Sequence, residues 1–273
     1  MGADFYVRAA RACYFILHEE KMGQVASVFF SELDEQAPTP KVIVIDGIIA
    51  AGKTVFIAGL RRYLQNMGFR VVVVDEPVEQ WKKTGRLEQF YKDPQKRAYQ
   101  FQTMAFHTRI MNARDIWNEW GNDVDFVLME RCPNTDPIFM NLLLNNKTID
   151  KTEMEDYMAL WNLWLELAPY TPRYFIYLRP SLEAVMNRLK ERSRKGESAV
   201  TEEYQRALQA EHDRHLPAGD FEMVVGDSRF DASCLILQTD ENFRDDKDVR
   251  DRLMGDVLKF VASKEQKPRD SSE

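Results

Sequence analysis

Eight residues from Gly47 to Thr54 have the spacing that a phosphate-binding loop requires. They read Gly-Ile-Ile-Ala-Ala-Gly-Lys-Thr, which is the pattern G-x-x-x-x-G-K-[ST] between an apolar run and a helical pattern. Backbone N–H groups in such a loop surround a phosphate, a lysine such as Lys53 reaches the β- and γ-phosphates, and a hydroxyl such as that of Thr54 binds Mg²⁺. The residues expected to bind a nucleoside triphosphate are Gly47, Ile48, Ile49, Ala50, Ala51, Gly52, Lys53 and Thr54.

Glu76 follows the next apolar run, 70–75, at the end where ligands bind in open α/β sheets. An alcohol that accepts a phosphoryl group must lose its proton, so a carboxylate at this place is a candidate general base. On position alone, an exposed loop acid fits the pattern equally well. After a third run, 124–129, Glu130 and Arg131 offer one carboxylate for a metal ion and one guanidinium for a phosphate.

The pattern around these residues predicts the elements that position them. Short apolar runs alternate with helical periodicity, which is typical of a parallel sheet covered by helices on both faces. The predicted strands are 41–46, 70–75, 124–129, 173–178 and 234–238. The predicted helices are 54–67, 95–120, 134–146, 152–168, 181–193, 201–215 and 246–262. We therefore predict an α/β domain with a five-stranded parallel sheet over residues 41–262, an N-terminal helical extension over 1–40, and a flexible tail over 263–273.

Charge and cysteine content restrict the partners. The chain has 273 residues, with 44 acidic against 37 basic side chains and a net charge of −7, which disfavours nucleic acid and anionic lipid. No apolar run approaches the roughly 20 residues of a membrane span. Cys13, Cys132 and Cys234 form no disulfide pattern, and no targeting signal is readable, so we expect a cytoplasmic protein.

Several further segments resemble the deoxyribonucleoside kinases, in particular the deoxycytidine and deoxyguanosine kinases. They are Glu76–Trp81 (EPVEQW), Tyr91–Pro94 (YKDP), Phe101–Thr103 (FQT) and Glu130–Cys132 (ERC), in the order found in that family, within a likeness over about 41–261. The resemblance implies a P-loop kinase fold with a helical lid, ATP and Mg²⁺ as cofactors, a deoxynucleoside as substrate, and a homodimer.

The resemblance also implies roles for residues on the ATP side. Glu76, Arg131 and Lys53 would be catalytic, and Thr54 and Glu130 would hold Mg²⁺. The basic cluster with Arg188, Arg192 and Arg194 is similar to the family's lid over the phosphates, although a charge run taken alone is typical of a solvated helix face. Glu241, Asn242 and Phe243 resemble the loop around the base of ATP.

On the nucleoside side, Tyr91 and Glu197 match residues that bind the sugar 3′-hydroxyl, and Gln102 can read a base edge. Arg109 and Asp136 resemble the charged pair of the deoxycytidine and deoxyguanosine kinases, which favours cytosine or a purine; an isolated pair of this kind is usually structural. Met140 matches the residue that stacks on the base, with Phe139 one position earlier, so either the contact is softer or the register shifts by one. The predicted nucleoside site comprises Glu76, Trp81, Phe90, Tyr91, Phe101, Gln102, Ala105, Arg109, Arg131, Asp136, Met140 and Glu197.

The function predicted from these residues is ATP-dependent phosphorylation of the 5′-hydroxyl of a deoxynucleoside to its 5′-monophosphate, with deoxycytidine or a purine deoxynucleoside favoured. The alternatives are a thymidine-type or broad-specificity enzyme, a nucleoside monophosphate kinase, and a kinase-like scaffold without activity. One pattern fits none of these: His212 and His215 lie three apart on a predicted helix without a third ligand, which is more typical of surface residues than of a metal site.

Overall fold

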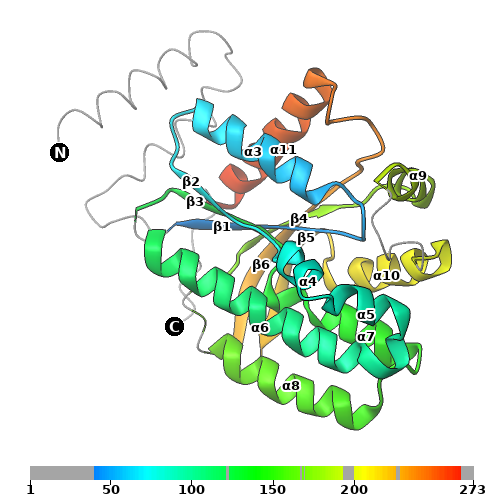
Figure 1. Cartoon of the computed structure of the whole chain (residues 1–273). Coiled ribbons are helices and arrows are strands. Elements are labelled where there is room, and N and C mark those ends of the chain that lie inside the picture. The colour runs from blue at the N-terminus through cyan, green and yellow to red at the C-terminus, as the bar shows by residue number, and fades with distance from the viewer. Residues whose placement is uncertain are drawn as a thin grey trace.

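A six-stranded sheet with helices on both sides forms the part of the chain that the computed structural model describes, residues 40–120, 123–166, 168, 170–192, 200–225 and 228–265 (Figure 1). The strands are β1 (Lys41–Asp46), β2 (Val71–Val74), β3 (Phe126–Glu130), β4 (Tyr174–Leu178), β5 (Gly219–Val225) and β6 (Ser228–Leu237), in the order β2-β3-β1-β4-β6-β5. β1 lies between β3 and β4 and pairs with both in parallel. The predicted extension (1–40, apart from Pro40) and most of the predicted tail lie outside the described residues.

The sheet differs from the predicted one by a sixth strand, and β6 begins at Ser228, six residues before the predicted strand 234–238. β5 pairs antiparallel with β6, with Gly219 opposite Cys234, so the sheet is parallel except at this edge. In β5 the side chains of Phe221 and Met223 pack against the core, whereas Val224 is exposed. A pattern of this kind lacks the continuous apolar run of a buried parallel strand, which is why the sequence prediction missed it.

The helices follow the predicted pattern with two additions. They are α3 (Lys53–Asn66), α4 (Val78–Lys83), α5 (Arg86–Lys92), α6 (Pro94–Trp120), α7 (Pro137–Asn145), α8 (Lys151–Glu166), α9 (Leu182–Arg192), α10 (Glu202–His215) and α11 (Lys247–Glu265). The short helices α4 and α5 were not predicted. The predicted helix 134–146 is a 3₁₀ turn followed by α7, because Pro137 has no N–H to continue the turn and begins a new helix.

Alternation along β1 divides the core between the two faces of the sheet. Ile43 and Ile45 pack in one cluster with Leu60 of α3, whereas Val42 and Val44 pack in another with Ala113 of α6. Figure 1 accordingly shows α3 and α11 on one side of the sheet and α6 and α8 on the other. No described helix is long and apolar enough to cross a lipid bilayer.

Candidate active site

The loop between β1 and α3 is shaped by two glycines. Gly47 has φ +146°, and a Cβ there would lie 2.5 Å from the carbonyl oxygen of Leu178. Gly52 has φ +99°, and a Cβ there would lie 2.7 Å from the ring of Phe243. Both positions therefore require glycine for space as well as for backbone conformation.

Lys53 and Thr54 begin α3 at the end of this loop. The Lys53 ammonium donates to the carbonyl oxygens of Gly47 (3.1 Å) and Ile48 (3.2 Å), so it is buried within the curve of the loop. Burial, together with repulsion from Arg131, lowers the pKa of Lys53 to about 8. Because burial and Arg131 disfavour the charged form of Lys53, a nearby anion would stabilise that form, as expected of a lysine that binds phosphate.

The predicted metal ligands lie together. The Thr54 hydroxyl donates to Oε2 of Glu130 at 2.9 Å, which joins the start of α3 to the end of β3. Both groups offer hard oxygen atoms, the type that Mg²⁺ binds. Within the described residues no cluster of three or more acidic, histidine or cysteine side chains could hold a metal by itself. Thr54 and Glu130 thus fit a Mg²⁺ site as two hard oxygen donors.

Glu76 and Asp136 share one arginine. Arg109 of α6 donates through one arm to Glu76 and through the other to Asp136, both at 2.5 Å, and its guanidinium lies 5.1 Å from the centre of the Trp81 ring. Burial opposes ionisation of Glu76, but Arg109, Arg131 and Lys53 outweigh it and hold the pKa of Glu76 below its usual value. At Asp136 burial prevails over Arg109 and raises the pKa to about 7. Glu76 is therefore the ionised partner at neutral pH.

Arg131 lies on the other side of Glu76. Its Nε is 3.5 Å from the Glu76 carboxylate, its terminal nitrogens donate to Asp46 (3.2 Å) and to the Gly47 carbonyl (2.8 Å), and it is buried. Its guanidinium lies 4.5 Å from the centre of the Phe139 ring. Arg131 thus connects the candidate base directly to the phosphate loop.

One cavity of about 340 Å³ joins these groups to an aromatic slot. Phe90 and Phe101 stack with ring centres 4.7 Å apart, and Trp81 meets the edge of Phe101. The predicted residues that line the cavity are Ile49, Ala50, Lys53, Thr54, Glu76, Trp81, Phe90, Tyr91, Phe101, Gln102, Arg109, Glu130, Arg131 and Arg192. The cavity therefore connects the phosphate loop to a flat apolar slot of the kind that accepts a ring.

Three predicted nucleoside contacts lie behind the cavity wall. Ala105 and Met140 are fully buried in the cluster that backs the aromatic slot, and Asp136 lies beneath Arg109. Phe139 lines the cavity where Met140 was expected, so the register shifts by one residue. The turn of α7 that follows Pro137 points Met140 into the cluster and Phe139 toward Arg131.

On the ATP side the two described arginines of α9 differ. Arg192 lines the cavity, whereas Arg188 donates to the carbonyl oxygens of Ala51 (3.2 Å) and Thr239 (2.5 Å) and thereby ties the phosphate loop to the segment after β6. In that segment Phe243 packs over Gly52 and against Phe56.

Two neighbours of Phe243 make local contacts instead. Glu241 binds Arg252, and Asn242 binds Asp245. The predicted residues Arg194 and Glu197 lie outside the described residues.

Comparison with protein families shows to which enzyme family the chain belongs. Residues 43–262 match the model of the family described as "Deoxynucleoside kinase". The chain belongs to the deoxynucleoside kinase family. The predicted enzyme class, a kinase that phosphorylates a deoxynucleoside, is thereby confirmed.

Known deoxynucleoside kinases are similar over most of the chain. A probable deoxycytidine kinase of fowlpox virus is 30% identical over 233 residues, which cover 82% of this chain and 89% of the viral protein. Deoxycytidine kinase 2 of Gallus gallus is 28% identical over 254 residues, covering 81% and 90%. A solved deoxyadenosine kinase from M. mycoides with bound dCTP has a TM-score of 0.61 at 24% identity and covers 80% of this chain and 99% of its own, which shows the same fold.

Some residues of this kinase site were missed by the sequence prediction. Asp75, Val78, Glu79, Leu87 and Tyr204 also line the cavity. Val78 and Glu79 lie within the quoted EPVEQW segment and Asp75 directly precedes it, so all three were within reach of the same argument. Tyr204 reaches the cavity from α10, which is far from Glu76 in the sequence, and only the fold brings the two residues into the same cavity.

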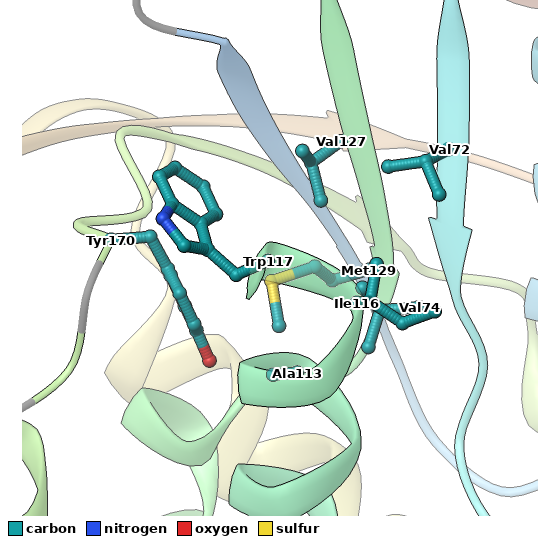
Figure 2. Close-up of a pocket in the computed structure, with 8 residues that line it drawn as sticks. All are labelled: Val72, Val74, Ala113, Ile116, Trp117, Val127, Met129 and Tyr170. Atoms are coloured by element: carbon teal, nitrogen blue, oxygen red, sulfur yellow. The ribbon is translucent and has the colours of Figure 1, made fainter. Parts of the chain in front are cut away.

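A second hollow, between β2, β3 and α6, differs in character (Figure 2). Its lining is apolar apart from the indole N–H of Trp117 and the hydroxyl of Tyr170, whose ring centres are 5.6 Å apart. Figure 2 shows Val72 and Val127 on the strands opposite these aromatic rings. It contains no group for acid–base or phosphoryl chemistry, so the reaction is assigned to the first cavity.

Proposed function

We propose that this kinase transfers the γ-phosphoryl group of Mg-ATP to the 5′-hydroxyl of deoxycytidine or a purine deoxynucleoside. The observation that carries the proposal is the single cavity that has the phosphate loop at one end, Glu76 in the middle, and the aromatic slot with Gln102 and Arg109 at the other. A nucleoside in the slot would direct its 5′-oxygen toward Glu76 and the phosphates.

Glu76 would accept the proton of the 5′-hydroxyl. Its pKa lies below the usual value, so the carboxylate is ionised at neutral pH and ready to act as a base. A base positioned in this way contributes about 10²- to 10⁴-fold to the rate. Because Arg109 donates a hydrogen bond to Glu76 at 2.5 Å, the 5′-hydroxyl of a bound nucleoside would compete with Arg109 for this carboxylate.

The cations around Glu76 would stabilise the charge on the transferring phosphoryl group. Lys53 would bind the β- and γ-phosphates, Arg131 would align the 5′-oxygen and the transferring group, and Arg188, Arg192 and Arg194 would form the lid. Thr54 and Glu130 would hold Mg²⁺, which neutralises phosphate charge and orients the phosphates when bound.

The base preference rests on Arg109. Arg109 lines the cavity, and its buried Nε–H has no hydrogen-bond partner among the described residues. Cytosine presents an acceptor at N3, and guanine presents acceptors at N7 and O6, whereas thymine presents an N–H at N3 that would meet the arginine donor with a donor. Tyr91, and Glu197 in the part outside the described residues, would bind the 3′-hydroxyl. The viral and avian relatives, which are called deoxycytidine kinases, support the same choice.

An acceptor panel tests the proposal. Product analysis with Mg-ATP and deoxycytidine, deoxyadenosine, deoxyguanosine or thymidine should give 5′-monophosphates, with thymidine the poorest acceptor. Deoxycytidine monophosphate and thymidine monophosphate serve as controls, because a monophosphate acceptor needs additional cations for its own phosphate. Preferential formation of diphosphates, or equal use of thymidine, would contradict the proposal.

The remaining parts of the proposal concern the whole protein. We propose a homodimer in a reducing cytoplasmic compartment, with 41–262 as the catalytic domain and 1–40 and 263–273 as an extension and a tail. The two described cysteines, Cys132 and Cys234, are buried and unbridged, in agreement with such a compartment. Light scattering of the full chain tests the dimer.

A further inference from the structure

Asp46 is a buried carboxylate that the proposed reaction does not use. It ends β1 directly before the phosphate loop and is fully inaccessible. Its Oδ1 accepts from three donors: the Gly47 backbone N–H (2.7 Å), a terminal nitrogen of Arg131 (3.2 Å) and Nε2 of His212 (3.3 Å). Its other oxygen is buried and has no hydrogen-bond partner within the described part of the chain. One carboxylate oxygen thus links three separate segments.

His212 completes this arrangement from α10. The sequence pattern indicated a surface residue, and that interpretation is wrong, because His212 is fully buried. Nδ1 donates to the Leu208 carbonyl at 2.8 Å, and Nε2 faces Asp46. Both ring nitrogens of His212 thus face oxygen atoms that can accept a hydrogen bond. Although burial opposes ionisation of Asp46, Arg131 and His212 keep its pKa below the usual value.

The ring of His212 is held firmly in place. It stacks on Tyr177, with centres 5.6 Å apart and planes 22° apart, and it meets Phe139 edge-on at 6.1 Å. Phe139 in turn packs beneath the guanidinium of Arg131. His212 therefore supports Arg131 from two directions, through Asp46 and through Phe139.

Arg131 depends on such support because of its backbone. It leaves β3 with φ +60°, a conformation that L-residues rarely adopt, and its N–H donates to the Ile45 carbonyl at 3.0 Å. From this turn its side chain must reach back to the loop and to Glu76. Arg131 lines the cavity, whereas neither Asp46 nor His212 does.

We propose that His212 and Asp46 are positioning residues that orient Arg131 for phosphoryl transfer. This inference rests on the proposed role of Arg131. An arginine that is free to rotate still binds phosphate, but it no longer lies where charge develops in the transition state, and a misplacement of about 1 Å can cost about 10²-fold in rate. The loss should therefore fall on kcat rather than on KM.

His212→Phe tests the proposal, because phenylalanine keeps the ring packing on Tyr177 and Phe139 and removes both ring nitrogens. We expect kcat to fall by about 10- to 10²-fold, with the KM values for nucleoside and ATP within about threefold. His215→Phe is the matched control. It lies on the same helix and contacts Asn141 and Glu211 instead of Asp46, so its kcat should not change.

A double-mutant cycle separates positioning from general stabilisation. In the Arg131→Ala background, His212→Phe should reduce kcat by less than about twofold, because the group it positions is gone. A multiplicative loss in that background would overturn the proposal. So would a His212→Phe enzyme with the kcat of the wild type. An Arg131→Ala enzyme with unchanged kcat would instead overturn the role of Arg131 in the proposed function, and the positioning role with it.

Asp46→Asn is the second variant, in case His212→Phe does not fold. Its side-chain oxygen can still accept from Gly47 and Arg131, so folding, followed by circular dichroism, should survive better than with Asp46→Ala. We expect Asp46→Asn to lower kcat and, in the same cycle, to add less than about twofold to Arg131→Ala. Independent, multiplicative losses would overturn the proposal here too.

Discussion

Arg109→Met is the substitution whose consequences follow most directly from the geometry. Arg109 is the cation between two carboxylates, Glu76 and Asp136, and its side chain is 8% exposed. Methionine fills a similar volume and removes the charge. Three effects are expected, on stability, on pH dependence and on base preference.

The loss of stability follows from burial. Breaking a buried ion pair by removal of one partner costs about 3–5 kcal/mol. The pKa of Asp136 is already about 7 beside Arg109, so without Arg109 this carboxyl is protonated at neutral pH and does not remain as a buried charge. The cost should therefore lie near the lower end, about 3 kcal/mol, which corresponds to a fall in Tm of about 6–12 °C for a protein of this size.

The pH profile follows from Glu76. Burial raises its pKa and the cations lower it, and Arg109 is the largest of the lowering influences. Without Arg109 the pKa of Glu76 rises. Because the ionised form is the base, the acid limb of the profile of kcat/KM against pH should move to higher pH, and activity should be lost first at the acidic end. Use of cytosine or purine nucleosides should also fall while thymidine use rises.

The assay is steady-state kinetics from about pH 4 to 9 with Mg-ATP and each of the four deoxynucleosides, together with thermal unfolding. Arg114→Met is the matched control, since Arg114 lies on the same helix, is half exposed and bonds to Asp115. An Arg109→Met enzyme with the acid limb of the wild type, the Tm of the Arg114→Met control and an unchanged acceptor profile would show that Arg109 has none of these three roles.

Three further predictions follow from the site. Glu76→Gln should retain ATP binding in calorimetry and slow turnover by at least about 10²-fold, and near-normal turnover would remove Glu76 from the mechanism. Because burial lowers the pKa of Lys53 to about 8, its ammonium loses the proton above that pH, and kcat/KM for ATP should fall on the basic side near pH 8. Lys53→Arg should shift this basic limb to higher pH. A basic limb identical to that of the wild type would assign the titration to another group. Gly52→Ala would place a Cβ 2.7 Å from Phe243 at φ +99°, and it should lower the free energy of unfolding by about 1–3 kcal/mol and weaken ATP binding. The control Gly255→Ala, inside α11 with its nearest contact at 3.9 Å, should raise the free energy of unfolding by up to about 1 kcal/mol. Equal effects of the two substitutions in urea unfolding would show that Gly52 is not required by its backbone conformation and its contact with Phe243.

The parallel part of the fold was predictable because its strands are continuous apolar runs. The predicted strand 41–46 agrees with β1 residue for residue, Glu76 follows β2 as expected, and Glu130 is the last residue of β3. β5 was not predictable in this way, because it is an antiparallel edge strand with one exposed face.

The site was predictable where neighbours in sequence carry it, and not where contacts cross the fold. Lys53 and Thr54 follow from one motif. His212 is buried against Asp46, which lies 166 positions away in the chain, and no local pattern in the sequence reveals this contact. Likewise Phe139 lines the cavity where Met140 was expected, because the start of α7 at Pro137 decides which side chain faces the cavity, and an ungapped sequence match does not show this.

A crystal structure of the enzyme with deoxycytidine and a non-hydrolysable ATP analogue would show directly whether Glu76 is the base. We expect the 5′-oxygen at about 2.6–3.2 Å from the Glu76 carboxylate, on the side of the phosphate loop, with the base between Phe139 and the Phe90–Phe101 stack. A 5′-oxygen beyond hydrogen-bond reach of Glu76, with the sugar elsewhere in the cavity, would contradict that role of Glu76.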